Sequence, residues 1–492
     1  MRKTTVASTV AFAAVFALAG PVAAGPAAVS SLVTVSGPSP YAGCTVGGSG
    51  TNYSNAEVEP FVAVNPQNAS NIVGVFQQDR WSNGGAHGLS TVVSMNRGLT
   101  WTEPAAPHFS TCAGGTAQNG GGYDRSSDPW VSIGPDGRAY QVSLSVNATE
   151  TISAVLASTS TDGGMTWSEP ATLVRDDDSS PHFNDKESVT ANPYHAGVAY
   201  VVWDRSGLPS DSASTSALNH SFAFRGSPFF SMTTDGGATW SPARQIGPNQ
   251  NIFSIGNQIV VEPDGTLVDV FHFGKGSGLD APNQSFIGLL RSTDGGARWS
   301  QPIIISTNPV VAPADPDNGV PMRTGSDVGG SIPDVAVDPG SGALYVVWED
   351  SRFSGTHDDI AISKSTDEGR TWSAPTKANL TPNGAIAFTP AVDVLPDGAV
   401  AVTYYDIRNN TPAAGLPTDF FVAHSHDGGT TWSEAAITSA SFDDTFAPNS
   451  RGYFLGDYQG LAHDATAFKT FFVKTNNDTS NRTDVFAAAI TP

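Results

Sequence analysis

Beyond residue 55 the chain alternates between short apolar runs and clusters of Gly, Pro, Asn and Asp. Residues 61–64 and 72–76 are two such runs, and Asn65 and Pro66 stand between them. Short apolar runs that are bounded by turn residues are typical of strands buried on both faces. The pattern therefore predicts antiparallel strands joined by tight turns.

This pattern recurs as a unit of four strands. First strands are expected at residues 61–64, 130–133, 259–261, 335–337 and 392–394. Second strands are expected at residues 72–76, 200–203, 345–348 and 400–405. Third strands are expected at residues 90–93, 152–156, 229–232, 286–290, 360–363 and 420–423, and fourth strands at 171–174, 303–305 and 435–438. A repeated four-stranded antiparallel unit is the blade of a β-propeller.

An octapeptide follows each third strand, and its copy at residues 160–167 reads STDGGMTW. Its copies share an Asp, replaced once by Asn, at Asn96, Asp162, Asp235, Asp294, Asp367 and Asp427, which are 66, 73, 59, 73 and 60 residues apart. In such a turn the Asp accepts backbone N–H groups, the Gly supplies a positive φ, and the final Trp packs into the core. Six copies at near-regular spacing indicate one structural repeat.

A seventh, partial unit follows the last octapeptide. Residues 460–462, 470–473 and 485–490 fit three strands, and residues 31–35 form a strand-like run that fits the fourth. We therefore predict an all-β fold, a single propeller of seven four-stranded blades closed by the N-terminal strand. Closure of this kind removes exposed sheet edges. Six blades with a C-terminal appendage are the alternative.

The octapeptide resembles the Asp-box, also called the bacterial neuraminidase repeat. Over residues 55–492 the chain is similar to the sialidase-like Asp-box propeller superfamily. That superfamily includes sialidases, xyloglucan-degrading hydrolases, polysaccharide lyases and non-catalytic proteins. Its box lies away from the active face, so the resemblance implies a fold and leaves the reaction open. Sialidases have six blades, which differs from the seven units expected here.

Charge and composition narrow the class of protein. The chain has 24 Lys and Arg against 46 Asp and Glu, a net charge of −22. It therefore lacks the basic surface of a protein that binds nucleic acid or anionic membranes. Its 51 Gly and 34 Pro argue against a helical bundle. We expect a monomer with no nucleic-acid partner and no membrane association after removal of a signal peptide.

The N-terminus has the layout of a secretory signal peptide. Arg2 and Lys3 precede an uncharged run at residues 6–20, and small residues at 22–24 offer a cleavage site. The run is short for a membrane anchor, which is the alternative. We expect residues 1–24 to be a signal peptide, residues 25–54 an N-terminal segment with the closing strand, and residues 55–492 the propeller of a secreted, extracellular protein.

The chain has two cysteines, Cys44 and Cys112. Two cysteines in an exported protein predict one disulfide between them. Two free thiols are the alternative.

Candidate site residues lie on the face opposite the octapeptide turns. Long polar connections are expected there at residues 110–128, 176–187, 312–333 and 441–459, and such loops commonly carry binding sites. Aligning the units places one ring at the mouth of the central channel: Glu59, Asp128, Asp185, Glu187, Asn257, Asp457 and Tyr458. Crowded carboxylates suit acid/base catalysis or calcium binding, and hydrogen bonding to loop backbones is the alternative.

Four arginines follow second strands, each near an acidic residue: Arg80, Arg205, Arg352 and Arg408. Guanidinium groups pair bidentately with carboxylates, and the resemblance to sialidases implies arginines that hold the carboxylate of the sugar. The alternative is that each Asp–Arg pair caps the end of its own strand.

The resemblance also implies catalytic roles. A sialidase needs a Tyr nucleophile paired with a Glu, and an Asp as acid/base, and Tyr458, Glu187 and Asp128 match these types. Glu59, Asp185 and Asp457 join the four arginines as candidate substrate-binding residues. The Arg-Ile-Pro motif of sialidases has its nearest match at residues 331–333, which read SIP, and this departure puts sialidase activity in doubt.

The sequence therefore predicts a sialidase-like glycoside hydrolase that acts on an extracellular glycan or polysaccharide. A non-catalytic propeller that binds a glycan or a protein, and a polysaccharide lyase, are the alternatives. The chain has no phosphate-binding loop, dinucleotide fingerprint or His-Glu-x-x-His zinc motif. We expect no cofactor, with structural calcium left open; residues 315–319 resemble a calcium loop only faintly because they lack its terminal Glu.

Overall fold

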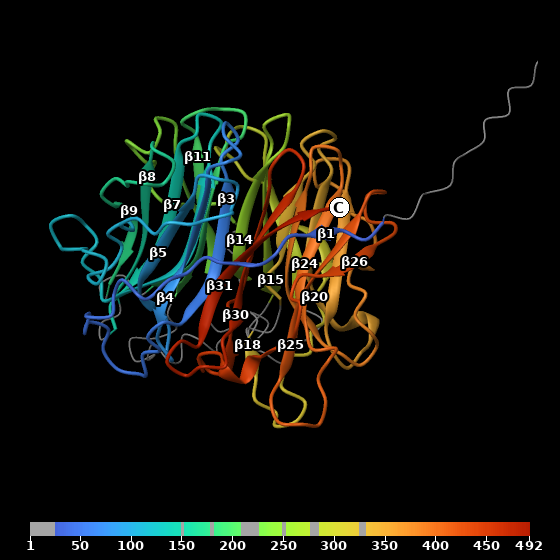
Figure 1. Ribbon diagram of the computed structural model, residues 1–492. Coiled ribbons are helices and arrows are strands. Elements are labelled where there is room, and N and C mark those ends of the chain that lie inside the picture. Colours follow the sequence, from blue (N-terminus) through green and yellow to red (C-terminus); the bar gives the residue numbers. More distant parts are fainter. Residues whose placement is uncertain are drawn as a thin grey trace, which may run out of the picture.

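The computed structural model describes residues 25–148, 152–177, 182–207, 226–247, 252–275, 285–323 and 331–492, so the expected signal peptide at 1–24 lies outside the described residues. The described chain is all-β apart from two short 3-10 helices, η3 (Ser351–Phe353) and η4 (Asp444–Phe446). Within these ranges no helix is long and apolar enough to span a bilayer. Most strands run along one direction in Figure 1, and the loops gather at their two ends.

Most strands belong to antiparallel meanders that follow one another along the chain. The first three meanders are β3 (Glu57–Val64), β4 (Ile72–Arg80) and β5 (Ala86–Ser94); β6 (Arg125–Ile133), β7 (Ala139–Val146), β8 (Ser153–Ser160) and β9 (Ala171–Asp176); and β10 (His182–Ala191), β11 (Ala199–Gly207), β12 (Gly226–Thr233) and β13 (Arg244–Gln245). The next three are β14 (Ile252–Val261), β15 (Leu267–Lys275), β16 (Ser285–Ser292) and β17 (Ile303–Thr307); β19 (Asp334–Val337), β20 (Leu344–Asp350), β21 (Asp359–Ser365) and β22 (Thr376–Lys377); and β23 (Ala387–Val394), β24 (Val400–Asp406), β25 (Pro417–Ser425) and β26 (Ser433–Ala436).

The last meander contains strands from both ends of the chain. Its members are β29 (Gly460–His463), β30 (Phe468–Thr475) and β31 (Thr483–Thr491), with β1 (Ala28–Val29) and β2 (Val33–Thr34). Ala28 pairs with Thr491, and Val33 pairs with Ala487, so both N-terminal strands lie along β31. Two minor pairings complete the sheets: β18 (Met322–Arg323) with β28 (Tyr453–Phe454), and β27 (Phe442–Asp443) with β25.

The first strands of successive meanders lie against one another. β3 contacts β6, β6 contacts β10, β10 contacts β14, β14 contacts β19, β19 contacts β23, and β23 contacts β29. β29 in turn contacts β3. The first strand of each meander is therefore its innermost strand, and the residues at the start of these strands are brought together.

The octapeptide forms the turn that the sequence predicts. In the copy at residues 160–167, the Oδ1 atom of Asp162 accepts from the backbone N–H of Thr166 at 2.9 Å, and its Oδ2 atom accepts from the Thr166 hydroxyl at 2.6 Å. Gly163 and Gly164 have φ values of 77° and 93°, a region that glycine enters at little cost. The ring N–H of Trp167 donates to the carbonyl of Gly164 at 3.0 Å. Equivalent Asp–Thr bonds recur at Asp235, Asp367 and Asp427.

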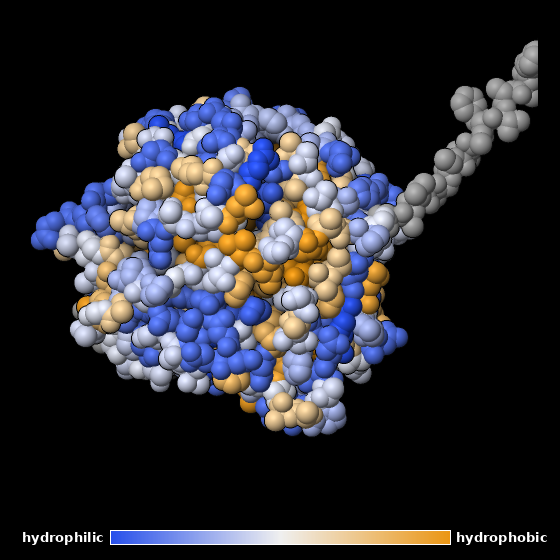
Figure 2. All heavy atoms as spheres, in the orientation of Figure 1, coloured by the Kyte–Doolittle hydropathy of each residue, from blue (hydrophilic) through white to orange (hydrophobic). Residues whose placement is uncertain are grey.

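The core consists of apolar clusters between neighbouring meanders. One cluster packs Val142 of β7 against Val189 of β10 and Trp203 of β11, and the octapeptide residue Trp240 packs against it. The other octapeptide tryptophans pack against different clusters in the same way. In Figure 2 hydrophilic residues dominate the two loop-bearing ends of the visible face, and hydrophobic residues gather across its middle. Burial between sheets explains why the strands read as nearly continuous apolar runs.

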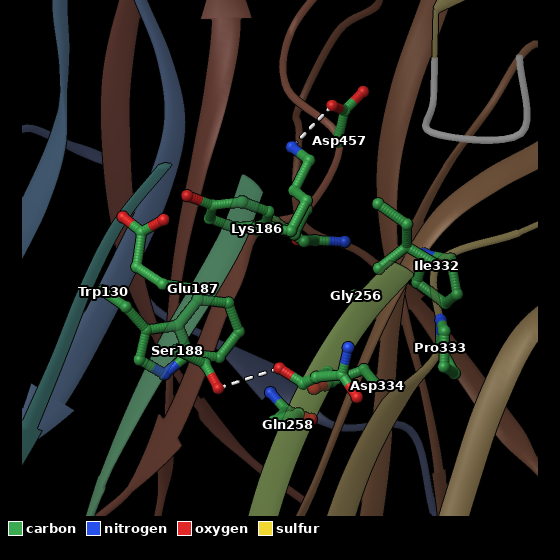
Figure 3. A pocket seen from close by; sticks show the side chains of 14 residues that line it. Trp130, Lys186, Glu187, Ser188, Gly256, Gln258, Ile332, Pro333, Asp334 and Asp457 are labelled. Carbon is green, nitrogen blue, oxygen red and sulfur yellow. Dashed lines mark hydrogen bonds and ion pairs between the residues drawn. The ribbon is translucent and has the colours of Figure 1, made fainter. Parts of the chain in front are cut away.

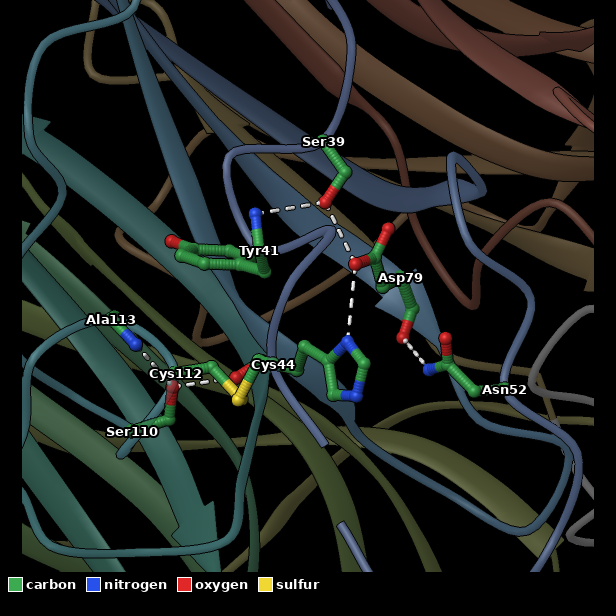
Figure 4. Close-up of a disulfide and its surroundings, with 9 residues drawn as sticks. Ser39, Tyr41, Cys44, Asn52, Asp79, Ser110, Cys112 and Ala113 are labelled. Carbon is green, nitrogen blue, oxygen red and sulfur yellow. Dashed lines mark hydrogen bonds and ion pairs between the residues drawn. A yellow bond between two sulfur atoms is a disulfide. The ribbon is translucent and has the colours of Figure 1, made fainter. Parts of the chain in front are cut away.

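The predicted disulfide between Cys44 and Cys112 is confirmed, and no cysteine is free. It joins the segment that precedes β3 to the connection between β5 and β6 (Figure 4). Beside it, the hydroxyl of Ser39 donates to Asp79 at 2.7 Å, and Asp79 also accepts the backbone N–H of Asn55 at 2.9 Å. The N-terminal segment is thus held to β4 by both covalent and polar contacts.

Candidate functional site

The inner strands share a bulge near their starts. The strand register shifts between Val58 and Phe61 in β3, between Ser127 and Trp130 in β6, and between Asp185 and Ser188 in β10. Each bulge holds one residue in the left-handed region: Glu59 (φ 53°), Asp128 (φ 50°) and Lys186 (φ 48°). A non-glycine residue there costs about 1–2 kcal/mol, and bulges commonly re-aim side chains beside functional sites.

The equivalent bulge of β14 carries a glycine. Gly256 has a φ of 73°, and a Cβ atom built at this position would lie 2.7 Å from Cγ2 of Ile332. A larger residue would therefore displace Ile332. At this point of the ring the side chain of Ile332 occupies the space that a side chain at position 256 would fill.

Lys186 lies at the centre of the ring and contacts three carboxylates. Its Nζ atom lies 2.9 Å from Oε1 of Glu59, 2.8 Å from Oδ1 of Asp128 and 2.6 Å from Oδ2 of Asp457. The Lys186 side chain is 9% exposed and the three carboxylates are less exposed still. An ammonium group has three N–H donors. Each donor of Lys186 therefore faces one carboxylate of the ring.

Burial and these charges set the protonation of the ring. Burial favours the neutral form of Lys186, but the surrounding carboxylates outweigh it and hold the pKa of Lys186 well above its ordinary value. Burial raises the pKa of Glu59 to about 7, and the charge of Lys186 opposes that rise. The pKa of Asp128 is also raised by burial and is lowered in turn by Lys186.

Glu187, the residue after Lys186, lies in a different environment. It lines a pocket of about 460 Å³, open mouth included, whose other walls include Trp130, Ile332, Asp334 and Asp457 (Figure 3). Glu187 is 2% exposed, and neither of its carboxylate oxygens has a hydrogen-bond partner. Burial, reinforced by the charge of Asp128, raises its pKa well above the usual range. Burial thus favours the protonated form of Glu187, beside carboxylates that are paired with a cation.

Aromatic side chains form one wall of this pocket. The rings of Trp130 and Tyr458 lie 5.2 Å apart between centroids, and Trp130 stacks on Phe61 at 3.6 Å. The hydroxyl of Tyr458 donates to the carbonyl of Pro129 at 3.1 Å. Burial, together with the charge of Glu59, raises the pKa of Tyr458 well above its ordinary value. Tyr458 is thus a neutral phenol whose proton is engaged.

The four arginines do not converge on the pocket. Arg205 donates to Asp176 at 2.8 Å, and Arg352 donates to Asp350 at 2.8 Å. Arg408 contacts Glu434 at 2.5 Å and Asp406 at 2.6 Å. Arg80 donates instead to Gln77 at 2.6 Å, and its guanidinium lies 4.5 Å from the ring centre of Phe454. Each arginine has its own partners in a different part of the molecule.

The structure therefore brings together only part of the residue set that the sequence predicts. Glu59, Asp128 and Asp457 meet at Lys186, and Glu187, Asn257 and Tyr458 line the adjoining pocket. Asp185 does not line the pocket, and its carboxylate accepts the backbone N–H of Lys186.

Lys186 was not among the sequence-predicted residues, although its two neighbours Asp185 and Glu187 were. The signal was present: residues 188–191 align with 61–64 and 130–133, which sets Lys186 level with Glu59 and Asp128.

In the described part of the chain, no group of three or more His, Cys, Asp or Glu side chains is placed to hold a metal ion. In the segment at residues 315–319, Asp315 accepts from the side chain of Asn318 at 2.6 Å and from the backbone N–H of Asp317 at 2.9 Å. These bonds stabilise the turn from within.

Comparison with known proteins gives a partial match. No protein-family model matches the chain. A sialidase from Micromonospora viridifaciens is 30% identical to it over 141 residues, which cover 25% of this chain and 19% of the sialidase. The chain thus matches about a fifth of the length of that relative.

Similar solved structures are distant. A Hadza microbial sialidase superposes with a TM-score of 0.47 at 16% identity, over 85% of this chain and 73% of that one. The α-L-arabinofuranosidase Arb93A of Fusarium graminearum has a TM-score of 0.45 at 11% identity, over 94% and 98% of the two chains. A Trypanosoma rangeli sialidase has a TM-score of 0.41 at 11% identity, over 79% and 55%. No comparison assigns the chain to a family.

Proposed function

We propose that the protein is a glycoside hydrolase whose active site is the pocket beside Lys186. The observation that supports this most is the pairing of a buried, partnerless carboxyl group, Glu187, with a nearby carboxylate, Asp457, that is held against a cation. Glycoside hydrolysis commonly requires one protonated carboxylic acid and one ionised carboxylate at the same bond. The partial match to a bacterial sialidase is in keeping with a glycan substrate.

In this proposal the two carboxyl groups have separate roles. Glu187 donates its proton to the glycosidic oxygen as the C–O bond breaks, and Asp457 stabilises the positive charge that develops on the sugar or activates a water molecule. Trp130 and Tyr458 provide a wall for the apolar face of a sugar ring. Asp128 does not line the pocket, so its role is to fix Lys186.

The experiment is a hydrolysis assay of the purified protein, with products followed by mass. The panel contains sialosides, neutral glycosides including arabinosides, and uronate polymers. On the substrate that is cleaved, Glu187→Gln should lower the rate by about 10²–10⁴-fold, the usual contribution of a general acid. Glu262→Gln is the matched control, because burial also raises the pKa of Glu262, to about 7, at a position outside the pocket.

The contacts of the four arginines favour a second function, glycan binding without hydrolysis. Because each is engaged with its own partners, a propeller that binds a glycan without cleaving it is the competing proposal. Binding on a glycan array without turnover on any panel member would replace the hydrolase proposal with this one. An unsaturated product absorbing in the near ultraviolet would instead identify a lyase.

The proposal extends to the whole chain. We propose a single closed propeller of seven blades, which the succession of contacts between the inner strands supports, with the octapeptides as Asp-boxes. We also propose a secreted monomer that loses residues 1–24; the layout of the N-terminus and the disulfide support secretion. N-terminal sequencing and light scattering of the exported protein test these points, and retention of residue 1 would contradict signal removal.

A further inference from the structure

The walls of the pocket carry acidic groups that are not matched by available cations. Of the described residues that line it, Lys186 is the one cationic side chain, and its three donors face three carboxylates. Glu187 lies on one side of the pocket, and Asp334 on another (Figure 3). Asp334 is half-buried, and it accepts the backbone N–H of Val392 at 2.7 Å. Among the described lining residues, a ligand therefore lies against carboxyl groups and against no cation that is free of an ion pair.

The ion pairs of the three arginines Arg205, Arg352 and Arg408 also indicate that no cation is available to an anionic ligand. Arg352 and Arg408 are each neutralised by the acid that ends the preceding strand, Arg205 is neutralised by Asp176 at the end of β9, and none of the three lines the pocket. To bind the carboxylate of a sugar, such an arginine would have to break a charge-assisted pair that is already formed. Removing one partner of such a pair exposes the other charge, so this exchange is unfavourable.

We propose that the pocket selects an uncharged sugar, because the carboxylate of Asp457 lines the pocket and the cation beside it, Lys186, is already paired. A neutral sugar offers hydroxyl groups and ring oxygens that can both accept from and donate to the protonated carboxyl of Glu187. A sialic acid or a uronate would place its carboxylate near Glu187 and Asp457 without a cation to balance it. Selection by a repulsive element of this kind is a common basis of specificity. The identity of the ligand as a sugar rests on the proposed function; the exclusion of anions rests on the pocket itself.

The first test compares matched ligands that differ only in charge. A uronate polymer and its carboxyl-reduced form, and a sialylated glycan and its desialylated form, are titrated against the wild-type protein at low ionic strength. The neutral member of at least one pair should bind about tenfold or more tightly than its anionic partner. In Asp457→Asn, which removes a carboxylate from the pocket wall and leaves Lys186 with two carboxylate partners in place of three, this ratio should fall, while Glu262→Gln should leave it unchanged. Equal or tighter binding of the anionic members would overturn the inference and leave a glycan function standing.

The second test does not depend on glycans. The fluorescence of Trp130, obtained as the difference between the wild type and Trp130→Phe, is quenched with iodide, caesium and acrylamide. Caesium and acrylamide should quench this difference signal, and iodide should have a Stern–Volmer constant about fivefold or more smaller. Iodide quenching as strong as caesium quenching would refute an anion-excluding pocket. If no glycan binds at all, the proposed function fails and the quenching result alone decides the charge selection. If Trp130→Phe does not fold, the matched ligands decide it.

Discussion

Three side chains in the left-handed region define the site at the scale of single residues. Glu59, Asp128 and Lys186 each pay a backbone cost of about 1–2 kcal/mol at their bulges. The strain turns them toward one another, and the resulting ion pairs among buried groups offset it. Strained residues of this kind persist where the surrounding structure holds them and cluster at functional sites.

Replacing Lys186 should be strongly destabilising. Lys186→Met leaves three buried carboxylates without their cation, so we expect the free energy of unfolding to fall by about 3–5 kcal/mol. Because the charge of Lys186 lowers the pKa of Glu59, its removal raises that pKa above the wild-type value of about 7, and protonation of Glu59 relieves part of the loss as the pH falls. Urea denaturation at two pH values measures both effects.

The matched control for Lys186 is Lys377, which pairs with one carboxylate, Asp359, at 2.7 Å and is 24% exposed. Lys377→Met leaves one buried carboxylate, Asp359, without its cation, where Lys186→Met leaves three, so it should cost clearly less than Lys186→Met. Similar losses for the two variants would contradict a special role for the buried ring.

At the scale of the structural element, one copy of the octapeptide has Asn in place of Asp and shows what the turn requires of this side chain. Asn96 occupies the Asp position in the first copy, where its Oδ1 accepts the backbone N–H of Thr100 at 2.9 Å and its Nδ2 donates to the Thr100 hydroxyl at 2.9 Å. The amide therefore reproduces the two bonds that Asp162 makes with Thr166. The turn requires the acceptor geometry of the side chain, and the charge is secondary.

Substitutions at Asp162 should follow this order. Asp162→Ala removes the acceptors of the turn and should lower the free energy of unfolding by about 1–2 kcal/mol, at about 0.5–1.5 kcal/mol for each net hydrogen bond. Asp162→Asn should cost less than about 0.5 kcal/mol, because it recreates the arrangement at Asn96. Thermal or urea unfolding distinguishes the two variants. An equal loss for Asn and Ala would show that the charge is essential.

The disulfide makes a separate prediction about the N-terminal segment. Cys44 and Cys112 are 68 residues apart, and a cross-link over a loop of this size typically contributes about 2–4 kcal/mol. The double variant Cys44→Ser with Cys112→Ser should lose that amount in urea denaturation. Reducing agent should lower the stability of the wild-type protein and leave the double variant unchanged. If reductant also lowered the stability of the double variant, the effect of reductant on the wild type could not be assigned to the disulfide.

Elements were more accessible to sequence reasoning than the site. Runs such as residues 72–76 and the repeated octapeptide carry strand and turn information locally, so an all-β repeat of four-stranded units could be read directly. The partners of Arg205 and Lys186 could not, because Asp176 and Asp457 come from distant segments. Alignment of the units sets Lys186 level with Glu59 and Asp128. Acidic side chains were expected at these positions, and a lysine did not fit that expectation.

At the scale of the whole molecule, buried acids set the pH dependence of stability. Burial raises the pKa of Asp204 to about 8, and that of Glu59, Glu262, Asp334, Asp358 and Asp444 to about 7. At a pH between the ordinary carboxyl pKa values and these raised values, these groups hold more protons in the folded protein than in the unfolded chain. The free energy of unfolding therefore falls as the pH rises through this window.

Two histidines act in the opposite direction. Burial lowers the pKa of His272 and His424 to about 4, so the unfolded chain takes up their protons first as the pH falls below 6.5. The carboxyl groups outnumber them, and we expect greater stability near pH 5 than at pH 8. Urea denaturation at both values measures the difference, and Glu262→Gln should reduce it. Greater stability at pH 8 would contradict the assignment.

The pairing of β1 and β2 with β31 has a consequence for the order in which the protein is made. The strands that lie along β31 are synthesised before all the other described strands, and β31 is synthesised after them. While the ribosome is still at work, the early strands have no partner, and the outer edge of the final sheet does not yet exist. The final sheet therefore forms only once β31 has left the ribosome, and a chain interrupted before residue 483 leaves an exposed edge that chaperones and proteases can recognise.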